Sequence, residues 1–274
     1  MEYTGYKILT LSNEELAKLY NEKIYDKEEF NENEYLIVKN EKEEIVDYFC
    51  FREGSFEQIK FPTIGNDFTG IMKPRNPQQY CMLESLKNKN VPIKLITGKF
   101  GTGKTMAIVV AALEAAQKGN FEKIIFVRNN VQVRETDQLG ALPGEAVDKM
   151  MPYLLPFADH CGGTEGLAHL IEAGQLEVIP LGFLRGRSIR NSIIYSMESE
   201  NLLKEHIQLL MGRVDVGSQL WLDGDVRQRD RSSFERSRGL EIMIERLKGN
   251  KNFGYIHLLK SERSEVAQSA DLLH

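Results

Sequence analysis

The stretch GKFGTGKT, at residues 98–105, has the composition and spacing of a loop that binds nucleotide phosphates. Gly98, Gly103, Lys104 and Thr105 occupy every fixed position of the pattern G-x-x-x-x-G-K-[ST]. The glycines let backbone N–H groups turn inward around phosphate oxygens, and a following helix presents its positive N-terminal end. We expect Lys104 to reach the β- and γ-phosphates and Thr105 to bind Mg²⁺. The remaining loop residues, expected in the same site, are Lys99, Phe100, Gly101 and Thr102.

A second stretch, NSIIYSMESEN, should carry the acids that such a site needs. Hydrolytic nucleotide sites usually add a strand ending in Asp-Glu, to hold Mg²⁺ and to activate water. Here the pair is Met197-Glu198, and a methionine has no charge and accepts hydrogen bonds only weakly. Mg²⁺ nevertheless keeps several waters and needs only one or two protein oxygens beside the phosphates. Thr105 supplies one oxygen, and Glu198 and Asp225 are the other candidate ligands.

The direction of the side chains at this strand end follows from alternation. Ser196 and Glu198 are expected on one side, with the serine hydroxyl near the water shell of the metal, and Met197 on the other, packed against the sheet. Glu200 could partly replace the missing acid. The alternative is that Glu198 and Glu200 only cap the helix expected near Asn201, where acids are favourable.

Three further segments carry side chains suited to a nucleotide site. RNPQQY precedes the strand of the loop, and Gln79 there could hydrogen-bond an adenine edge, with a plain polar helix start as an equal alternative. LDGDVRQRD follows an apolar run, and Asp225 and Gln228 at that strand end point into the crevice where such sheets bind ligands. SERSE offers Arg263 as a candidate arginine finger, although a single Arg is more often a solvated surface residue.

The elements that must position these residues alternate between strands and helices from about Asn76 onward. An apolar strand enters the loop, and an Ala-rich helix leaves it and stops at Gly119. Such alternation implies a parallel sheet with helices on both faces. We expect the strand SIIY beside the strand KLIT or one strand away. The strands are expected within PIKLIT, KIIFV, LEVIPL, SIIY, QLWL and YIHLL.

Residues 1–73 predict a small, acidic α+β region ahead of the main domain at residues 74–274. Residues 1–60 hold 15 acidic residues against 8 Lys or Arg, a net charge of −7 within a chain total of −5. Ser12 and Glu15 have the spacing of a capping box at a helix start. Short strands follow, and a segment rich in Gly, Pro, Asn and Asp, PTIGNDFTGIMKPRNP, marks the boundary.

Composition excludes several classes of protein. The chain has 274 residues, of which 42% are hydrophobic and 27% charged, as in an ordinary soluble protein. No apolar run approaches the roughly 18 residues of a membrane span, and the N-terminus lacks the features of a signal peptide. Three widely spaced cysteines predict free thiols in a reducing cytoplasm. The net charge argues against a general nucleic-acid binder but leaves room for a local basic groove.

Taken in order, these segments resemble the PhoH family of nucleotide-binding proteins over about residues 74–273. The resemblance implies a P-loop ATPase core related to superfamily-one helicases, which binds ATP and Mg²⁺ and assembles into hexameric rings. Some members act on RNA and carry an N-terminal PIN ribonuclease domain. About 75 residues precede the core, too few for that domain. In this respect the chain resembles the short branch of the family, which is found in bacteriophages and their hosts. The matching stretches are RNPQQY, GKFGTGKT, LGALPGEAVDKMMPYLLPFAD, PLGFLRGRSIRNSIIYSMESEN, GRVDVGSQLWLDGDVRQRD and GYIHLLKSERSEVAQSADLL.

The resemblance also implies roles for individual residues. Gln79 would read adenine, and Glu198 would be the catalytic carboxylate. Asp225 and Gln228 would sense the γ-phosphate and its metal, and Arg263 would reach the nucleotide from its own or a neighbouring subunit. The segment VRNNVQVRETDQLG departs from the family pattern, which weakens the case for a nucleic-acid contact there.

Three classes of function stay open on the sequence. The first is an ATPase that remodels RNA or single-stranded nucleic acid. The second is a nucleotide-gated binding or assembly protein with little turnover, because Met197 replaces an acid. The third is a small-molecule kinase, which is the weakest because GDVRQ and SERSE are typical of helicase-like ATPases.

Overall fold

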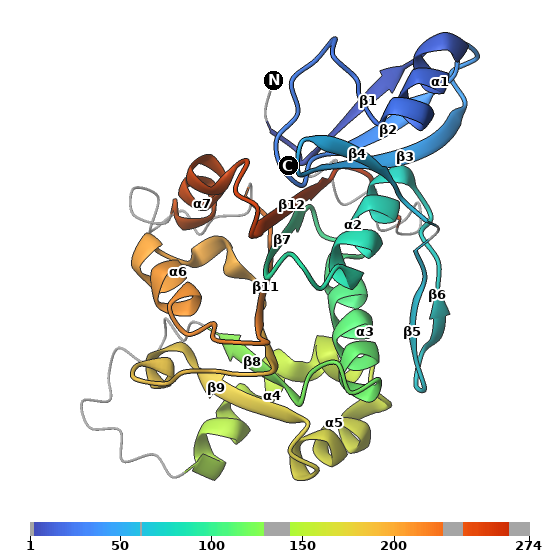
Figure 1. Cartoon of the computed structure of the whole chain (residues 1–274). Coiled ribbons are helices and arrows are strands. Elements are labelled where there is room, and N and C mark those ends of the chain that lie inside the picture. The colour runs from blue at the N-terminus through green and yellow to red at the C-terminus, as the bar shows by residue number, and fades with distance from the viewer. Residues whose placement is uncertain (1–2, 61, 129–142, 227–237, 263–274) are drawn as a thin grey trace, which may run out of the picture.

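The computed structural model describes residues 3–60, 62–128, 143–226 and 238–262, with the backbone alone at residues 143–150. Six strands form the central sheet of its larger part (Figure 1). They are β7 (Ile93–Gly98), β8 (Lys123–Arg128), β9 (Leu176–Pro180), β10 (Ser192–Ser196), β11 (Gln219–Gly224) and β12 (Phe253–Leu258). Their order is β12-β7-β11-β10-β8-β9, and every neighbouring pair is parallel. The predicted parallel α/β fold is confirmed, with β10 one strand away from β7.

Helices cover both faces of this sheet (Figure 1). The Ala-rich run after the glycine-rich loop forms α3, and its small side chains let the helix pack closely against the sheet. Helices α2 to α5 pack on one face and α6 and α7 on the other. Their bounds are α2 (Pro77–Lys87), α3 (Lys104–Gln117), α4 (Pro143–Ala158), α5 (Gly163–Glu172), α6 (Lys204–Met211) and α7 (Gly239–Leu247), with short 3-10 turns η1 (Leu181–Leu184) and η2 (Ser199–Asn201).

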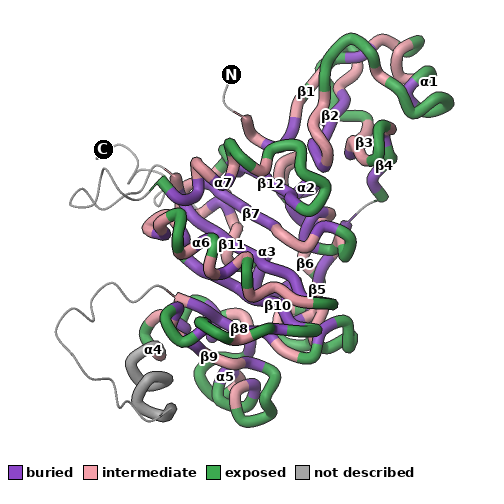
Figure 2. Tube along the Cα trace, turned by 60° about the vertical axis from the view of Figure 1, so that its left-hand side comes forward, coloured by how far each residue is buried: buried purple, intermediate pink, exposed green. Residues whose placement is uncertain are grey.

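Alternation along the central strands divides the core into two clusters. On β10, Ile193 and Tyr195 face the side of α3, while Ile194 faces the side of α6 and α7. On β11, Trp221 faces α3 and Leu222 faces the other side. Both faces are therefore buried, as expected for a parallel sheet, and the central strands are buried along most of their length (Figure 2).

The N-terminal region is a four-stranded sheet with one helix and its own small core. Its elements are β1 (Tyr6–Thr10), α1 (Asn13–Glu22), β2 (Tyr35–Lys39), β3 (Ile45–Arg52) and β4 (Ser55–Gln58). The strand order is β1-β2-β3-β4, with β1 parallel to β2 and the other pairs antiparallel. The predicted capping box of Ser12 and Glu15 is present at the start of α1.

The Gly- and Pro-rich segment that the sequence marks as a boundary is itself structured. It contains a hairpin of β5 (Ile64–Asn66) and β6 (Gly70–Met72), and β5 packs along α3 (Figure 1). The side chain of Asn66 accepts hydrogen bonds from the backbone N–H groups of Phe68 and Thr69, which shapes the turn. This segment therefore adds a layer to the main domain.

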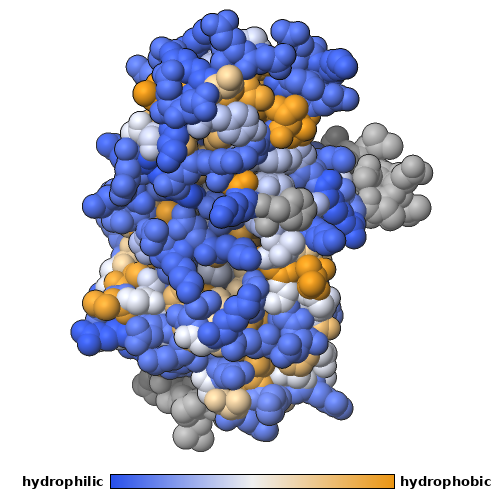
Figure 3. Space-filling model, turned by 45° about the vertical axis from the view of Figure 1, so that its right-hand side comes forward, coloured by the Kyte–Doolittle hydropathy of each residue, from blue (hydrophilic) through white to orange (hydrophobic). Residues whose placement is uncertain are grey.

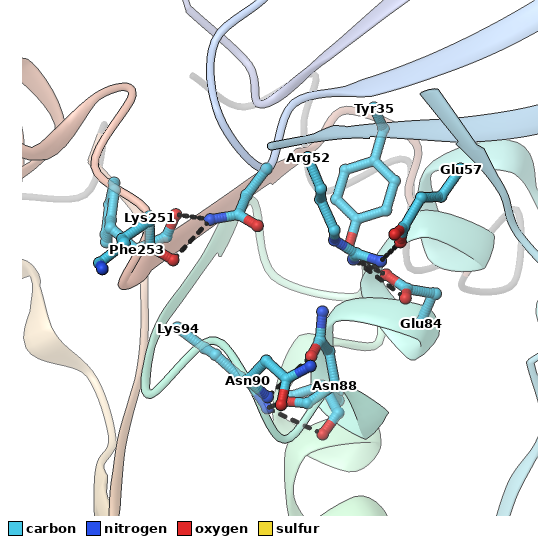
Figure 4. Close-up of polar contacts among 11 residues, drawn as sticks. Tyr35, Arg52, Glu57, Glu84, Asn88, Asn90, Lys94, Lys251 and Phe253 are labelled. Carbon is cyan, nitrogen blue, oxygen red and sulfur yellow. Dashed lines mark hydrogen bonds and ion pairs between the residues drawn. The ribbon is translucent and has the colours of Figure 1, made fainter. Parts of the chain in front are cut away.

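Polar contacts attach the N-terminal sheet to the main domain (Figure 4). The Arg52 guanidinium pairs with the Glu84 carboxylate of α2 at 2.8 Å, and the Tyr35 hydroxyl donates to the same carboxylate. The Asn33 amide donates to the carbonyl oxygens of Lys251 and Phe253, at 3.0 and 3.1 Å. The N-terminal sheet is thus held at the start of β12 and at the second half of α2.

The surface is mostly hydrophilic on the face seen in Figure 3, where hydrophobic residues form small separate groups. Ile71 of the hairpin is among the most exposed hydrophobic residues. Within the described residues, no helix has both the length and the apolar character needed to cross a bilayer.

Candidate nucleotide-binding site

The glycine-rich loop connects the end of β7 to the start of α3. A Cβ atom at Gly98 would lie 2.6 Å from the carbonyl oxygen of Leu258, so only glycine fits where β7 passes β12. Gly101 and Gly103 have φ angles of 78° and 87°, in the left-handed region that favours glycine. Gly103 caps α3 without a side-chain hydrogen bond, so the first N–H groups of the helix have no side-chain acceptor there. That arrangement suits the binding of an anion.

Internal hydrogen bonds close the loop on itself. The Thr102 hydroxyl donates to the carbonyl oxygen of Lys99 at 2.9 Å, and the Lys104 ammonium group reaches the same oxygen at 3.3 Å. The backbone N–H of Glu262, beyond β12, donates to the carbonyl oxygen of Gly101 at 2.9 Å. The segment that precedes Arg263 therefore lies against the loop, while Arg263 itself, like Gln228, falls outside the described residues.

A cavity of 340 Å³ lies beside the loop, at the carboxyl ends of the strands. This volume falls in the range of small-molecule sites. Seven of the predicted site residues line it: Phe100, Gly101, Gly103, Lys104, Thr105, Glu198 and Asp225. Residues that the sequence did not single out for the site also line it: Met106, Pro156, Asp159, His160, Asp223 and Gly224, together with Met197 and Glu200 of the discussed strand end.

A larger hollow of 1320 Å³ lies between the N-terminal sheet and the main domain. It is lined by a mixture of Lys, Glu and Asn side chains and has no glycine-rich turn or exposed helix start. We therefore place the nucleotide site in the smaller cavity, because it is lined by the glycine-rich loop and by the start of α3, whose backbone N–H groups suit phosphate.

Asp223, near the end of β11, has the most hydrogen bonds to other site residues among the lining residues that sequence reasoning missed. Its carboxylate is buried and accepts three hydrogen bonds, from the Thr105 hydroxyl at 2.8 Å, the Tyr195 hydroxyl at 3.1 Å and the Glu198 backbone N–H at 2.9 Å. Burial raises the pKa of Asp223, and the nearby Lys104 opposes that shift. A signal was available, because an Asp inside an apolar strand is costly to bury without partners.

The side chains at the end of β10 do not point as alternation suggested. Met197 lines the cavity and also packs in the core on the α3 side. The Ser196 hydroxyl accepts from the Ser199 hydroxyl at 3.0 Å and does not line the cavity. The expected serine near the metal is therefore wrong, because odd-numbered residues of β10 face α3 and the even-numbered ones face away.

Glu198 lies at the mouth of the cavity. Its φ angle is 52°, so the chain turns out of the strand at this residue, and 53% of its side chain is exposed. Its carboxylate pairs with Arg128 at the end of β8, and the Arg128 guanidinium lies 4.0 Å from the ring centre of Tyr153. Glu198 precedes η2 but makes no side-chain cap bond there, so the capping alternative has no support at this residue.

Glu200 is the second acid at this end of the cavity. Its carboxylate accepts from the backbone N–H of Asp225 at 3.3 Å. Burial raises the pKa of Glu200 from 4.5 to about 7. A carboxyl group with a raised pKa stabilises the folded protein while protonated, and that contribution is lost as the pH rises from 4.5 to about 7.

Replacing Glu200 with Gln should therefore stabilise the protein more at pH 8 than at pH 5. The free energy of unfolding of the variant relative to the parent should rise by roughly 1–3 kcal/mol between the two pH values. Urea titrations at both pH values measure it, with the exposed Glu205→Gln on α6 as the matched control. If the variant and the parent differ in free energy of unfolding by the same amount at pH 5 and at pH 8, the pKa of Glu200 is not raised.

Gln79 lies beneath the loop and does not line the cavity. It follows Asn76, whose side chain caps α2 by accepting from the Gln79 backbone N–H at 2.9 Å. The buried Gln79 amide donates to the carbonyl oxygen of Thr102 at 3.0 Å and accepts from the backbone N–H of Arg75 at 2.8 Å. Both ends of the amide are thus engaged with the backbone, in a position that supports the loop. The adenine contact stays a prediction.

Gln79→Ala should destabilise the protein by roughly 1–3 kcal/mol, because it leaves the buried carbonyl oxygen of Thr102 and the partly buried N–H of Arg75 without their side-chain partner. Gln78→Ala is the matched control, since the bond that Gln78 accepts from the Leu259 N–H is exposed and water can replace it. Chemical denaturation of both variants measures the effect. Equal losses in the two variants would contradict a supporting role for Gln79.

Comparisons with known proteins agree with this geometry. The PhoH family, described as PhoH-like protein, matches residues 71–271. Protein PhoH2 of Bacillus subtilis (strain 168) is 30% identical over 289 residues, which cover 99% of this chain and 64% of that protein. Protein PhoH2 of Mycolicibacterium smegmatis is 33% identical over 199 residues, covering 72% of this chain and 46% of that protein. The PhoH-like protein of Bacillus subtilis is 35% identical over 164 residues, covering 59% and 50%. The chain spans less than two thirds of the length of each of these relatives.

Proposed function

This chain belongs to the PhoH family of P-loop proteins, and from that premise we propose that it binds ATP with Mg²⁺ beside α3 and hydrolyses it. The observation that carries the proposal is that Lys104 and Thr105, at the start of α3, line the same cavity as the acids Glu198, Glu200, Asp223 and Asp225. Lys104 would contact the β- and γ-phosphates, and the N–H groups of the loop would surround the phosphate oxygens.

The residues present fit a bound Mg²⁺ ion. When bound, the ion neutralises charge on the phosphate oxygens and lowers the barrier to attack by water. Thr105 would supply a direct oxygen ligand, and Asp225 and Glu198 would hold waters of the metal. Among the described residues, no group of three or more His, Cys, Asp or Glu is placed to hold a metal ion by itself, but Mg²⁺ held mainly by phosphates and water does not need one.

Glu198 would orient the attacking water as a general base. Its carboxylate is exposed at the mouth of the cavity, where water and the γ-phosphate would meet. Geometry of this kind often tightens only when the substrate is bound. Turnover requires Glu198 to leave Arg128, and we therefore expect it to be slow.

The same contact favours a second candidate, a nucleotide-gated assembly protein with little turnover. The Arg128 pairing occupies the carboxylate that would activate water, and Met197 offers no charge to the metal. This candidate and the ATPase share the ATP site and differ only in phosphate release.

Calorimetric titration of ATP into the chain, with and without Mg²⁺, tests the shared part of the proposal. We expect saturable binding of one ATP per chain that is tighter in Mg²⁺. A titration without heat, together with unchanged thermal unfolding in ATP, would contradict nucleotide binding.

We also propose that the protein assembles into a ring, as a hexamer, and acts on RNA or single-stranded nucleic acid. The resemblance of its segments to the PhoH family supports both parts of this proposal. Light scattering in ATP and Mg²⁺ should find the hexamer, and a monomer at micromolar concentration with full activity would argue against it.

Labelled single-stranded RNA should bind more weakly as salt rises, because phosphate contacts release counterions. If no RNA binding is detected even at low salt, the proposed action on nucleic acid is contradicted.

A further inference from the structure

Met197 and Asp223 are neighbours on adjacent strands. The last paired residues of β10 and β11 are Ser196 and Leu222, so the next residues along each strand lie side by side. Both line the cavity, on the face of the sheet that carries α3. An acid is therefore missing from β10 and present one strand away, at a distance of about 4.8 Å between neighbouring strands.

The acid on β11 lies nearer to the glycine-rich loop than an acid at the end of β10 would. β11 lies directly beside β7, and Asp223 is paired in register with Ile96, two residues before the loop begins at Gly98. β10 is separated from β7 by the whole width of β11. A carboxylate on β11 can therefore reach the first turn of α3 without an intervening strand, as the bond from the Thr105 hydroxyl to Asp223 shows.

The hydrogen bond between Thr105 and Asp223 sets the direction of the threonine oxygen. A hydroxyl has one proton and two lone pairs, and the Thr105 proton is given to Asp223 at 2.8 Å. The lone pairs are then free to face a cation in the cavity. An ionised carboxylate has about four acceptor positions, and three of the Asp223 positions are taken by Thr105, Tyr195 and the Glu198 N–H. One position is left for a water bound to the metal.

We infer that Asp223 replaces the acid lost at Met197 and supports Mg²⁺ through Thr105 and a metal-bound water. The inference rests on the proposed ATP and Mg²⁺ site. It assigns the support of the metal to Asp223 in place of the usual Asp at the end of β10. The same carboxylate holds the Glu198 backbone at 2.9 Å, so it links the metal to the residue that would orient water.

A purely structural Asp223 is the competing explanation. A buried carboxylate with three donors is well satisfied and could serve only to join β10, β11 and α3. The two explanations differ in one property, the dependence of ATP affinity on Mg²⁺. A structural residue would affect ATP binding equally with and without the metal.

The test measures ATP affinity by calorimetry in saturating Mg²⁺ and in EDTA, and takes the ratio as the Mg²⁺ gain. Asp223→Asn should lower the gain by roughly 10- to 100-fold, the usual effect of losing a group that supports a metal ligand. Its affinity in EDTA should stay near that of the parent. Adding Met197→Asp to this variant should restore part of the gain. Asp67→Asn, in the turn between β5 and β6, is the matched control and should change neither affinity.

A single Met197→Asp variant keeps the inference testable if Asp223→Asn does not fold. Because Asp223 already supports Mg²⁺, the added acid should change the Mg²⁺ gain little. A rise of roughly tenfold or more would mean that the acid had been missing and would overturn the inference. An unchanged gain in Asp223→Asn, or equal losses in Mg²⁺ and EDTA, would overturn it too. A parent that binds no ATP would instead refute the proposed function itself.

Discussion

Glu198→Gln is expected to bind ATP nearly as well as the parent and to release phosphate roughly a hundred- to ten-thousandfold more slowly. Glutamine keeps the size and hydrogen-bonding capacity of the side chain but cannot take a proton from water. The Glu198 backbone N–H, which donates to Asp223 at 2.9 Å, is unaffected by the substitution. The end of β10 should therefore keep its place, and only the chemical step should suffer.

Single-turnover phosphate release and calorimetric ATP binding, measured on the same preparation, separate these two effects. Glu172→Gln, an exposed acid on α5, is the matched control and should behave as the parent. Parental turnover in Glu198→Gln would remove Glu198 from the mechanism. A large loss of ATP affinity in that variant would show a binding role in place of a catalytic one.

Lys104→Ala should weaken ATP binding by roughly 10- to 150-fold, which corresponds to the roughly 1.5–3 kcal/mol of a charge-assisted hydrogen bond. Lys104 is the first residue of α3 and lines the cavity, where its ammonium group reaches the carbonyl oxygen of Lys99 in the loop at 3.3 Å. Lys104 also lies close enough to Asp223 to influence its pKa, so its charge acts inside the cavity.

Calorimetry with ATP measures the loss, and Lys118→Ala at the far end of the same helix is the matched control. Lys118 is exposed and pairs with Glu114, one turn earlier in the helix, so its removal should leave ATP affinity intact. Equal affinity in Lys104→Ala and in the parent would place the nucleotide elsewhere on the protein.

The strands and the loop were predictable because their signals are local. Each central strand is a short apolar run, and the loop is set by glycines at fixed spacing followed by Lys104 and Thr105. Ser12 and Glu15 are likewise only three residues apart and form their capping box as predicted. Such patterns depend on backbone conformation within a few residues, so the sequence carries them directly.

The acids of the site were harder to predict because their roles depend on register between strands. Asp223 becomes a partner of Thr105 only when β11 lies between β7 and β10, 118 residues from Thr105 in the chain. The direction of Ser196 and Met197 depends on which face of β10 meets α3. Alternation gives two sets of residues but does not say which set faces the loop.

Gln79 shows the same limit for a polar residue. Its position before the loop suggested a contact with adenine, which stays a prediction, and gave no sign that its amide is buried and bonded to the backbone of Thr102. A sequence cannot distinguish a residue that touches a ligand from one that supports the loop touching it. The β5–β6 hairpin was missed for a related reason, since it is stabilised by packing on α3 and its own residues are turn formers.

Steady-state phosphate release from ATP by the unsubstituted protein, with and without Mg²⁺ and single-stranded RNA, tests the central claim most directly. We predict slow release that requires Mg²⁺ and increases when RNA is added. Tight ATP binding without any release, under every condition, would contradict hydrolysis and leave a protein that only holds its nucleotide.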